Sequence, residues 1–383
     1  MKRIGDGSRS LLSKELFNMG FRCGIVGLPN VGKSTIFNAL TAAGIAAENY
    51  PFCTIEPNVG IVPVPDARLD ILADIVKTRK KVHTQMEFVD IAGLVKGASK
   101  GEGLGNQFLG HIRQVDAIVH VIRCFEDDNV VHVDGSIDAD RDREIITMEL
   151  IMADLDTVEK RLRKSQSQAK SGDKFFREQV AFLEKLMAHL DSGKPARRLP
   201  LRSEIEEELV RELCLLTAKP VLYVANVSED DIRTGNDHVR RLEAAARADG
   251  DSVVVIAGSI EQELSQLDKE EQREFLQEME MEEPGLNRLI KAGYTLLGLQ
   301  TFFTVGEKET KAWTIPIGTK APAAAGKIHS DFEHGFIRAE VIAYADYVAC
   351  QGEAKAKEKG LMRVEGKEYV VADGDCMYFR FNV

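Results

Sequence analysis

One short run decides the fold class of this chain, and it reads Gly27-Leu28-Pro29-Asn30-Val31-Gly32-Lys33-Ser34. An apolar stretch at 21–26 precedes the run and predicts a strand, and a helix-forming stretch follows it directly, over 33–43. Backbone N–H groups of a glycine-rich turn at a helix N-terminus bind phosphate groups. The run therefore predicts a phosphate-binding loop for a nucleoside triphosphate, inside an α/β domain.

Two side chains of the run supply the chemistry that this loop needs. Lys33 can reach the terminal phosphates as a positive charge, and the hydroxyl of Ser34 can bind a magnesium ion. Gly27 and Gly32 leave the backbone free to approach the phosphates. We therefore expect Mg²⁺ as a cofactor.

The composition restricts the class of protein. The chain has 383 residues, 44% of them hydrophobic, which is enough for two or three domains with cores of their own. A net charge of -11 argues against general nucleic-acid binding, so any RNA contact must be local. The six cysteines are widely spaced, which favours reduced thiols. No apolar run approaches the roughly 20 residues that span a bilayer, so we expect a soluble, cytoplasmic protein.

The order of the expected elements divides the chain into four parts. These are an N-terminal extension (1–18), a nucleotide-binding domain (19–140 and 218–298), an inserted helical domain (141–217) and a C-terminal α+β module (299–383). In the nucleotide-binding domain we expect strands at 21–26, 59–64, 84–90, 116–122, 219–226 and 252–257, with helices at 33–43, 66–77, 104–113, 236–248 and 261–279. Alternating strands and helices predict a parallel sheet covered by helices.

The C-terminal module is expected to be a β-grasp fold. Short strands are predicted at 300–305, 312–317, 336–343, 369–371 and 376–381, with a helix near 353–359.

The inserted domain is predicted to be an antiparallel coiled-coil hairpin with a third helix at 203–217. Apolar residues recur at spacings of three and four, namely Met148, Ile151, Leu155, Val158 and Leu162, then Phe176, Val180, Leu183, Met187 and Leu190. The exposed faces carry a basic cluster, made of Lys160, Arg161, Arg163, Lys164, Lys170 and Lys174. This cluster is either a solvated helical face or a contact for RNA or another partner.

An acidic residue ends the strand expected at 84–90. Asp90 lies where such a residue holds magnesium beside a phosphate loop, and Gly93 allows a backbone N–H to approach the γ-phosphate. Thr54 lies in the loop before the second strand, where it can complete the magnesium shell or be an ordinary loop residue.

Leu94 occupies the position where many switch GTPases place a glutamine that orients the attacking water. An apolar side chain cannot do this, so water must be positioned by another group. The candidates are His132, His111, a backbone group, or a monovalent cation such as K⁺ near Asn30.

The expected base-recognition segment is Asn226-Val227-Ser228-Glu229. GTP-binding proteins carry an Asp at the last position, whose carboxylate accepts two hydrogen bonds from guanine. Glu229 is one methylene longer, whereas the amide of Asn226 can pair with adenine and Val227 offers an apolar contact. We therefore favour ATP over GTP, with guanine binding through Glu229 as the alternative.

In these motifs the chain resembles the Obg-like ATPase family, YchF. The resemblance covers nearly the whole chain from Met19 to Val383, including the phosphate loop, the segment after Asp90, the segment at 226–229 and a C-terminal motif at 324–332. It implies a Ras-like nucleotide domain, an inserted helical hairpin and a C-terminal TGS domain of β-grasp fold. It further implies a preference for ATP, slow hydrolysis and association with the ribosome in the cytoplasm.

The resemblance also assigns site residues. The phosphate and magnesium residues would be Asn30, Val31, Gly32, Lys33, Ser34, Thr35, Thr54 and Asp90. The adenine contacts would be Asn226 and Val227, and the histidine that activates water would be His132. The loop at 257–261 aligns with the family's last nucleotide-side loop but has Gly258 before Ser259.

The leading hypothesis is a monomeric, magnesium-dependent ATPase that acts as a nucleotide-controlled switch on ribosomes, with rRNA contacts through the hairpin and the TGS domain. Two alternatives remain. One is a switch GTPase that prefers GTP, and the other is a non-enzymatic ribosome- or RNA-binding module with a structural nucleotide.

Overall fold

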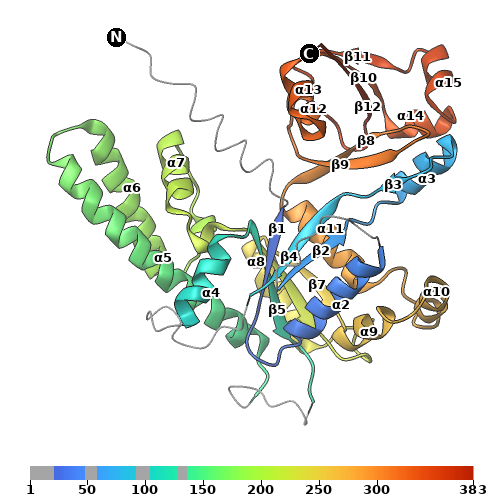
Figure 1. The fold of residues 1–383 in the computed structure, drawn as a ribbon. Coiled ribbons are helices and arrows are strands. Elements are labelled where there is room, and N and C mark those ends of the chain that lie inside the picture. The colour runs from blue at the N-terminus through green and yellow to red at the C-terminus, as the bar shows by residue number, and fades with distance from the viewer. Residues whose placement is uncertain (1–20, 48–57, 92–103, 128–135, 383) are drawn as a thin grey trace. The chain divides into compact units, whose positions relative to one another are not determined.

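The computed structural model describes residues 21–47, 58–91, 104–127 and 136–382. The chain forms two compact units (Figure 1). The first contains Arg22–Val62 and Glu87–Gly293, and the second contains Pro63–Met86 and Tyr294–Val383. Thr54, Leu94, His132 and residues 1–18 lie outside the described residues.

A six-stranded sheet in the order β2-β4-β1-β5-β6-β7 forms the centre of the first unit. Its strands are β1 (Arg22–Val26), β2 (Val59–Pro63), β4 (Gln85–Asp90), β5 (Ala117–Arg123), β6 (Val221–Asn226) and β7 (Ser252–Ile256). β1 pairs in parallel with β4 and β5, and the parallel pairing continues through β6 to β7. β5 and β6 are buried along their whole length, as central strands of a covered sheet are. The predicted parallel α/β arrangement is confirmed for these five strands. β2 is the exception and runs antiparallel to β4, because Asn58 is bonded to Asp90 at one end of the pair and Val64 to Thr84 at the other.

The helices of this sheet domain largely follow the prediction. They are α2 (Lys33–Ala47), α4 (Leu104–Arg113), α8 (Asp237–Asp249), α9 (Gly258–Leu264), α10 (Lys269–Glu278) and α11 (Gly285–Leu296). The prediction of a single helix over 261–279 is wrong. This segment is divided into α9 and α10, because Asp268 and Glu271 form a capping box that begins a new helix.

The predicted helical hairpin is confirmed. α5 (Ala139–Ala169) and α6 (Lys174–Asp191) lie side by side, with α7 (Glu204–Leu213) next to them (Figure 1). Most of the predicted heptad residues are buried or partly buried in one apolar cluster, but Met148 is 39% exposed. α7 ends four residues before the predicted limit, because Cys214 adopts a left-handed backbone with φ 47°. The short helix η3 (Leu216–Ala218) follows it.

The second unit is the predicted α+β module. Its sheet has the order β11-β10-β12-β8-β9-β3, with β8 antiparallel to β9 and parallel to β12. The C-terminal strands are β8 (Leu299–Thr304), β9 (Thr310–Pro316), β10 (Phe336–Ile342), β11 (Arg363–Glu365) and β12 (Cys376–Phe381). The helices are α12 (Ala321–Ile328), α13 (Ser330–His334), α14 (Tyr344–Ala349) and α15 (Glu353–Glu358). No strand forms at 369–371, where Val370 makes one isolated bridge with Lys320.

The segment Pro63–Met86 differs from the expected domain division. It was assigned to the nucleotide-binding domain, but its helix α3 (Ala67–Val76) and strand β3 (Lys81–Val82) pack with the C-terminal residues. β3 pairs with β9, and α3 buries Leu69 and Leu72 in the same apolar cluster as Phe303. The second unit is therefore built from two separate parts of the chain.

Within the described part of the chain, no helix is long and apolar enough to cross a membrane.

Candidate nucleotide-binding site

The phosphate loop connects β1 to α2, and its backbone has the conformation that the motif predicts. Asn30 and Gly32 have left-handed φ angles of 62° and 89°. A side chain at Gly27 would place its Cβ 2.7 Å from the carbonyl oxygen of Val121, so only glycine fits. The N–H of Ile36 donates to the carbonyl of Gly32 at 3.0 Å, which begins the helix. The loop amides and the start of α2 are thus positioned as an anion site.

A pocket of about 550 Å³ lies over this loop. Its lining comprises Leu28, Pro29, Asn30, Gly32, Lys33, Ser34, Thr35 and Phe125. Five of the predicted nucleotide-binding residues therefore line one pocket. The sixth residue of that loop, Val31, is only 1% exposed and packs beneath it.

Lys33 and Asp90 form an ion pair across the site. The side chains are 11% and 17% exposed, respectively, so the pair is largely shielded from water. Asp90 ends β4, and its backbone N–H donates to the carbonyl of Asn58 at 2.8 Å. The structure thus brings together two residues that the sequence analysis selected separately, 57 positions apart.

The residues present fit a magnesium ion. Ser34 and Asp90 offer a hydroxyl and a carboxylate, and oxygen donors are the ligands that Mg²⁺ prefers. Ser34 is exposed in the pocket, and the carboxylate of Asp90 contacts Lys33 beside it. Across the described residues, no three His, Cys, Asp or Glu side chains form a metal-binding group. A magnesium ion here would therefore take most of its ligands from phosphates and water.

Asn226 has a structural position that the sequence analysis did not predict. Its Nδ2 donates to the carbonyl of Val31 at 2.9 Å, and its Oδ1 accepts from the N–H of Gly258 at 3.0 Å. The side chain is 4% exposed. It therefore links the end of β6 to the phosphate loop and to the start of α9.

Two glycines allow this close packing around Asn226. A Cβ at Gly32 would lie 2.1 Å from Nδ2 of Asn226, and a Cβ at Gly258 would lie 3.3 Å from its Oδ1. The departure noted at Gly258 in the sequence thus has a physical reason. Gly258 begins α9, and its backbone N–H reaches the phosphate loop through the side chain of Asn226.

The other predicted base and water residues are not gathered in the same way. Val227 is 3% exposed, and its N–H donates to the carbonyl of Ile256 at 2.9 Å. Glu229 is exposed, and His111 is exposed in the last turn of α4. Their roles toward a nucleotide stay predictions, as do those of Thr54 and His132.

Phe125 is a pocket residue that the sequence analysis missed. Arg123 holds it in place. The guanidinium lies 4.6 Å from the centre of the Phe125 ring, and Nε donates to the Phe125 carbonyl at 3.1 Å. Arg123 is the last residue of β5, a fully buried strand, and is itself only 1% exposed although it carries a charge. A basic residue closing an apolar strand was the available signal, because a buried charge needs a defined partner.

Comparisons with known proteins cover both units. A family model described as "50S ribosome-binding GTPase" matches residues 22–153, and the YchF GTPase C-terminal model, described as a protein of unknown function, matches residues 299–382. The chain is 56% identical over 365 residues to "Ribosome-binding ATPase YchF" of Escherichia coli O157:H7, covering 95% of this chain and 100% of that protein.

Two further relatives agree with this match. "Ribosome-binding ATPase YchF" of Bacillus subtilis (strain 168) is 56% identical over 367 residues and is also covered completely. The solved structure of the Schizosaccharomyces pombe YchF GTPase is 38% identical, with a TM-score of 0.85 over 94% of this chain and 98% of that one. The similarity therefore extends over the sheet domain, the helical insertion and the C-terminal unit.

Proposed function

The chain belongs to the YchF family, and on this basis we propose that it is a magnesium-dependent ATPase that binds ribosomes as a nucleotide-controlled switch. The observation that carries the proposal is the pocket over the phosphate loop, which Lys33 and Ser34 line and where Lys33 pairs with Asp90. The relatives' names, which describe ribosome-binding ATPases, support the reaction and the partner. A cytoplasmic location follows from that partner.

The triphosphate replaces an interaction that is already present in the pocket. With a triphosphate bound, Lys33 would exchange the carboxylate of Asp90 for the terminal phosphates, and Asp90 would then be available to hold Mg²⁺ together with Ser34. Mg²⁺, when bound, neutralises charge on the phosphate oxygens. The loop amides and Ser34 fix the position of the phosphates, which is most of what phosphoryl transfer requires of a protein.

The base is adenine in this proposal. Glu229 stands where an aspartate would accept two hydrogen bonds from guanine, and Asn226 keeps one amide hydrogen for an acceptor on the base. Val227 would offer the base an apolar contact, and Phe125 lines the pocket over the phosphate loop. Loss of a paired hydrogen-bond contact typically costs about 1–3 kcal/mol, which is about five- to 150-fold in selectivity.

Hydrolysis is slow in this proposal because Leu94 cannot orient water. His132 is the residue proposed to activate it, with Thr54 completing the magnesium shell and K⁺ near Asn30 as a further aid. Replacing His132 by Ala should remove most hydrolysis but leave ATP affinity unchanged. Unaltered turnover in a single-turnover assay would reject its role.

Competition between ATP and GTP on the purified protein tests the proposal directly. We expect ATP to displace a fluorescent nucleotide at a concentration at least tenfold lower than GTP. Steady-state hydrolysis is then measured with and without ribosomes, and we expect ribosomes to raise the rate. Equal rates would exclude stimulation by the ribosome.

A GTP-preferring switch is the second candidate, because the S. pombe relative is described as a GTPase. A tenfold preference for GTP in the same competition would establish it in place of the ATPase.

A further inference from the structure

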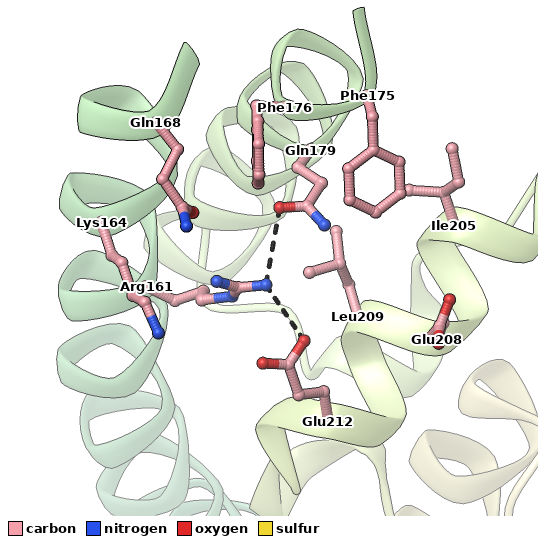
Figure 2. Close-up of a pocket in the computed structure, with 10 residues that line it drawn as sticks. All are labelled: Arg161, Lys164, Gln168, Phe175, Phe176, Gln179, Ile205, Glu208, Leu209 and Glu212. Carbon is pink, nitrogen blue, oxygen red and sulfur yellow. Dashed lines mark hydrogen bonds and ion pairs between the residues drawn. The ribbon is translucent and has the colours of Figure 1, made fainter. Parts of the chain in front are cut away.

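A second pocket, of about 310 Å³, lies inside the helical insertion (Figure 2). α5, α6 and α7 all contribute to its lining. It shares no residue with the pocket over the phosphate loop. The proposed ATP hydrolysis therefore does not involve this second pocket.

The polar groups inside this pocket are incompletely paired. Gln179 is 5% exposed, and its Oε1 accepts from Oγ of Ser165 at 3.3 Å. Within the described residues its Nε2 has no hydrogen-bond partner, and Figure 2 shows that nitrogen on the side of Leu209. Oε1 of Gln168 is buried without a partner as well. Nε2 of Gln179 is therefore a donor that a backbone carbonyl of a bound peptide can use.

One wall of the pocket is apolar and exposed. Phe175 is 43% exposed and packs against Phe176 with ring centres 5.5 Å apart. Figure 2 shows the Phe175 ring next to Ile205 of α7. An exposed aromatic ring beside carboxylates can bind a cation through its face.

The surface of α7 is acidic. α7 contains five glutamates and one arginine in ten residues. Among the residues that the structure describes, Glu204, Glu207 and Glu208 are exposed and have no ion-pair partner, whereas Glu212 pairs with Arg161 at 3.0 Å. The surface of α7 is therefore complementary to a positively charged partner.

The basic cluster of the hairpin is, in contrast, largely neutralised. Lys160 pairs with Asp156 at 2.5 Å, and Arg163 pairs with Glu159 at 2.6 Å. Lys174 pairs with Glu178 at 3.5 Å, although Lys164 at the pocket has no such partner among the described residues. These pairs weaken the case for a phosphate backbone at this surface and favour a protein.

We propose that this pocket and the acidic surface of α7 bind a basic protein segment on the ribosome. An arginine or lysine of that segment lies over Phe175 and donates to Glu208, while a backbone carbonyl accepts from Nε2 of Gln179. Further basic residues of the segment contact Glu204 and Glu207. This inference rests on the proposed ribosome binding.

A photocrosslink from the pocket identifies the occupant. Phe175 is replaced by p-benzoylphenylalanine in the full-length protein, which is bound to purified ribosomes and irradiated. We expect an adduct with a ribosomal protein, located by mass spectrometry within a lysine- and arginine-rich segment. The same replacement at Gln277, exposed on α10, is the control and should give no adduct at that segment.

The outcomes separate the two proposals. A wild-type protein that does not sediment with ribosomes overturns the proposed function and this inference with it. Sedimentation without an adduct from position 175 overturns the inference alone, and so does an adduct with rRNA only.

Charge removal provides an independent measurement. The triple substitution Glu204→Gln, Glu207→Gln and Glu208→Gln should weaken ribosome affinity about three- to tenfold, because exposed ion pairs contribute up to about 1 kcal/mol each. It should also lower the salt dependence of binding and leave ribosome-free ATP hydrolysis unchanged. The matched control replaces Glu270, Glu274 and Glu278 of α10 by Gln and should change affinity less than twofold. Equal affinities for both triple variants would overturn the proposal.

Discussion

At the scale of single residues, Asn226 has two tasks that the sequence could not separate. Its position at the end of β6 made it a candidate for recognising the base. The structure shows the same amide bonded to the phosphate loop at Val31 and to the first residue of α9 at Gly258. The geometry of the phosphate loop therefore depends on this side chain, and its role toward the base stays a prediction.

Replacing Asn226 by Ala should weaken the binding of ATP, GTP and inorganic tripolyphosphate alike. The substitution leaves the carbonyl of Val31 and the N–H of Gly258 buried without partners, at about 1–3 kcal/mol each. Tripolyphosphate has no base, so its affinity reports only on the phosphate loop. Titration calorimetry with the three ligands measures the effect, and Asn38→Ala, exposed on α2, is the control. Unchanged tripolyphosphate affinity would show that Asn226 acts on the base alone.

His120 makes the stability of the first unit depend on pH. Burial lowers the pKa of His120 to about 3, and Arg143 and Arg197 act in the same direction. The unfolded chain binds this proton near pH 6.5, whereas the folded chain does not until about pH 3. Stability is therefore complete above pH 6.5 and falls as the pH drops toward 3, by about 1.4 kcal/mol per pH unit.

The corresponding prediction compares His120→Leu with the wild type in urea unfolding at pH 7 and pH 5. The wild type should lose about 2 kcal/mol more between these two pH values than the variant, since only the wild type has the histidine. Both proteins share all other titrating groups, so the difference isolates this residue. The same pH dependence in both would contradict the assignment.

At the scale of elements, local patterns were predicted well and long-range pairings were not. The phosphate loop and the hairpin depend on spacings within a few residues, and both formed where the pattern placed them. The helix α3 was predicted, but the strand β3 was missed. β3 exists only through its pairing with β9. α12 was missed because its run of alanine and glycine has no apolar period.

The same distinction applies to the candidate site. Lys33, Ser34 and Asp90 were predicted from motifs, and the Lys33–Asp90 ion pair confirms their proximity. Phe125 was missed because its place in the pocket depends on Arg123 and on the turn after β5. Such a contact has no spacing in the sequence from which it could be derived.

Asp154 joins α5 to η3 and provides a test of how the insertion is fixed. Its carboxylate accepts from the backbone N–H groups of Leu216 and Thr217, both at 2.8 Å, and from the Thr217 hydroxyl at 2.6 Å. Asp154→Ala should lower the free energy of unfolding by about 2–4 kcal/mol, because buried donors lose a charged acceptor. Urea unfolding measures this. Asp156→Ala, exposed one half-turn further on, should change it by less than 1 kcal/mol.

At the scale of the whole molecule, the chain order and the structural units do not coincide. β2 and β4 belong to the nucleotide-binding sheet, but the residues between them complete the C-terminal unit. β3 and the leucines of α3 make some of the contacts to the C-terminal residues. Arg68 adds two more, because it binds Asp373 at 2.7 Å and lies 5.4 Å from the ring centre of Phe303. A substitution in the first quarter of the chain should therefore act on the last quarter.

Leu69→Ala tests this arrangement in the full-length protein. Leu69 is 0% exposed, so its truncation should destabilise the second unit by about 2–5 kcal/mol through lost burial and a cavity. Hydrogen exchange followed by mass spectrometry should show faster exchange in β8 and β12, whose residues Phe303 and Cys376 share that cluster. β5 and β6 of the first unit should exchange at the wild-type rate. Ile71→Ala, on the same helix but 43% exposed, is the control with little effect. Faster exchange confined to α3, with β8 and β12 unchanged, would show that α3 is not part of the second unit's core.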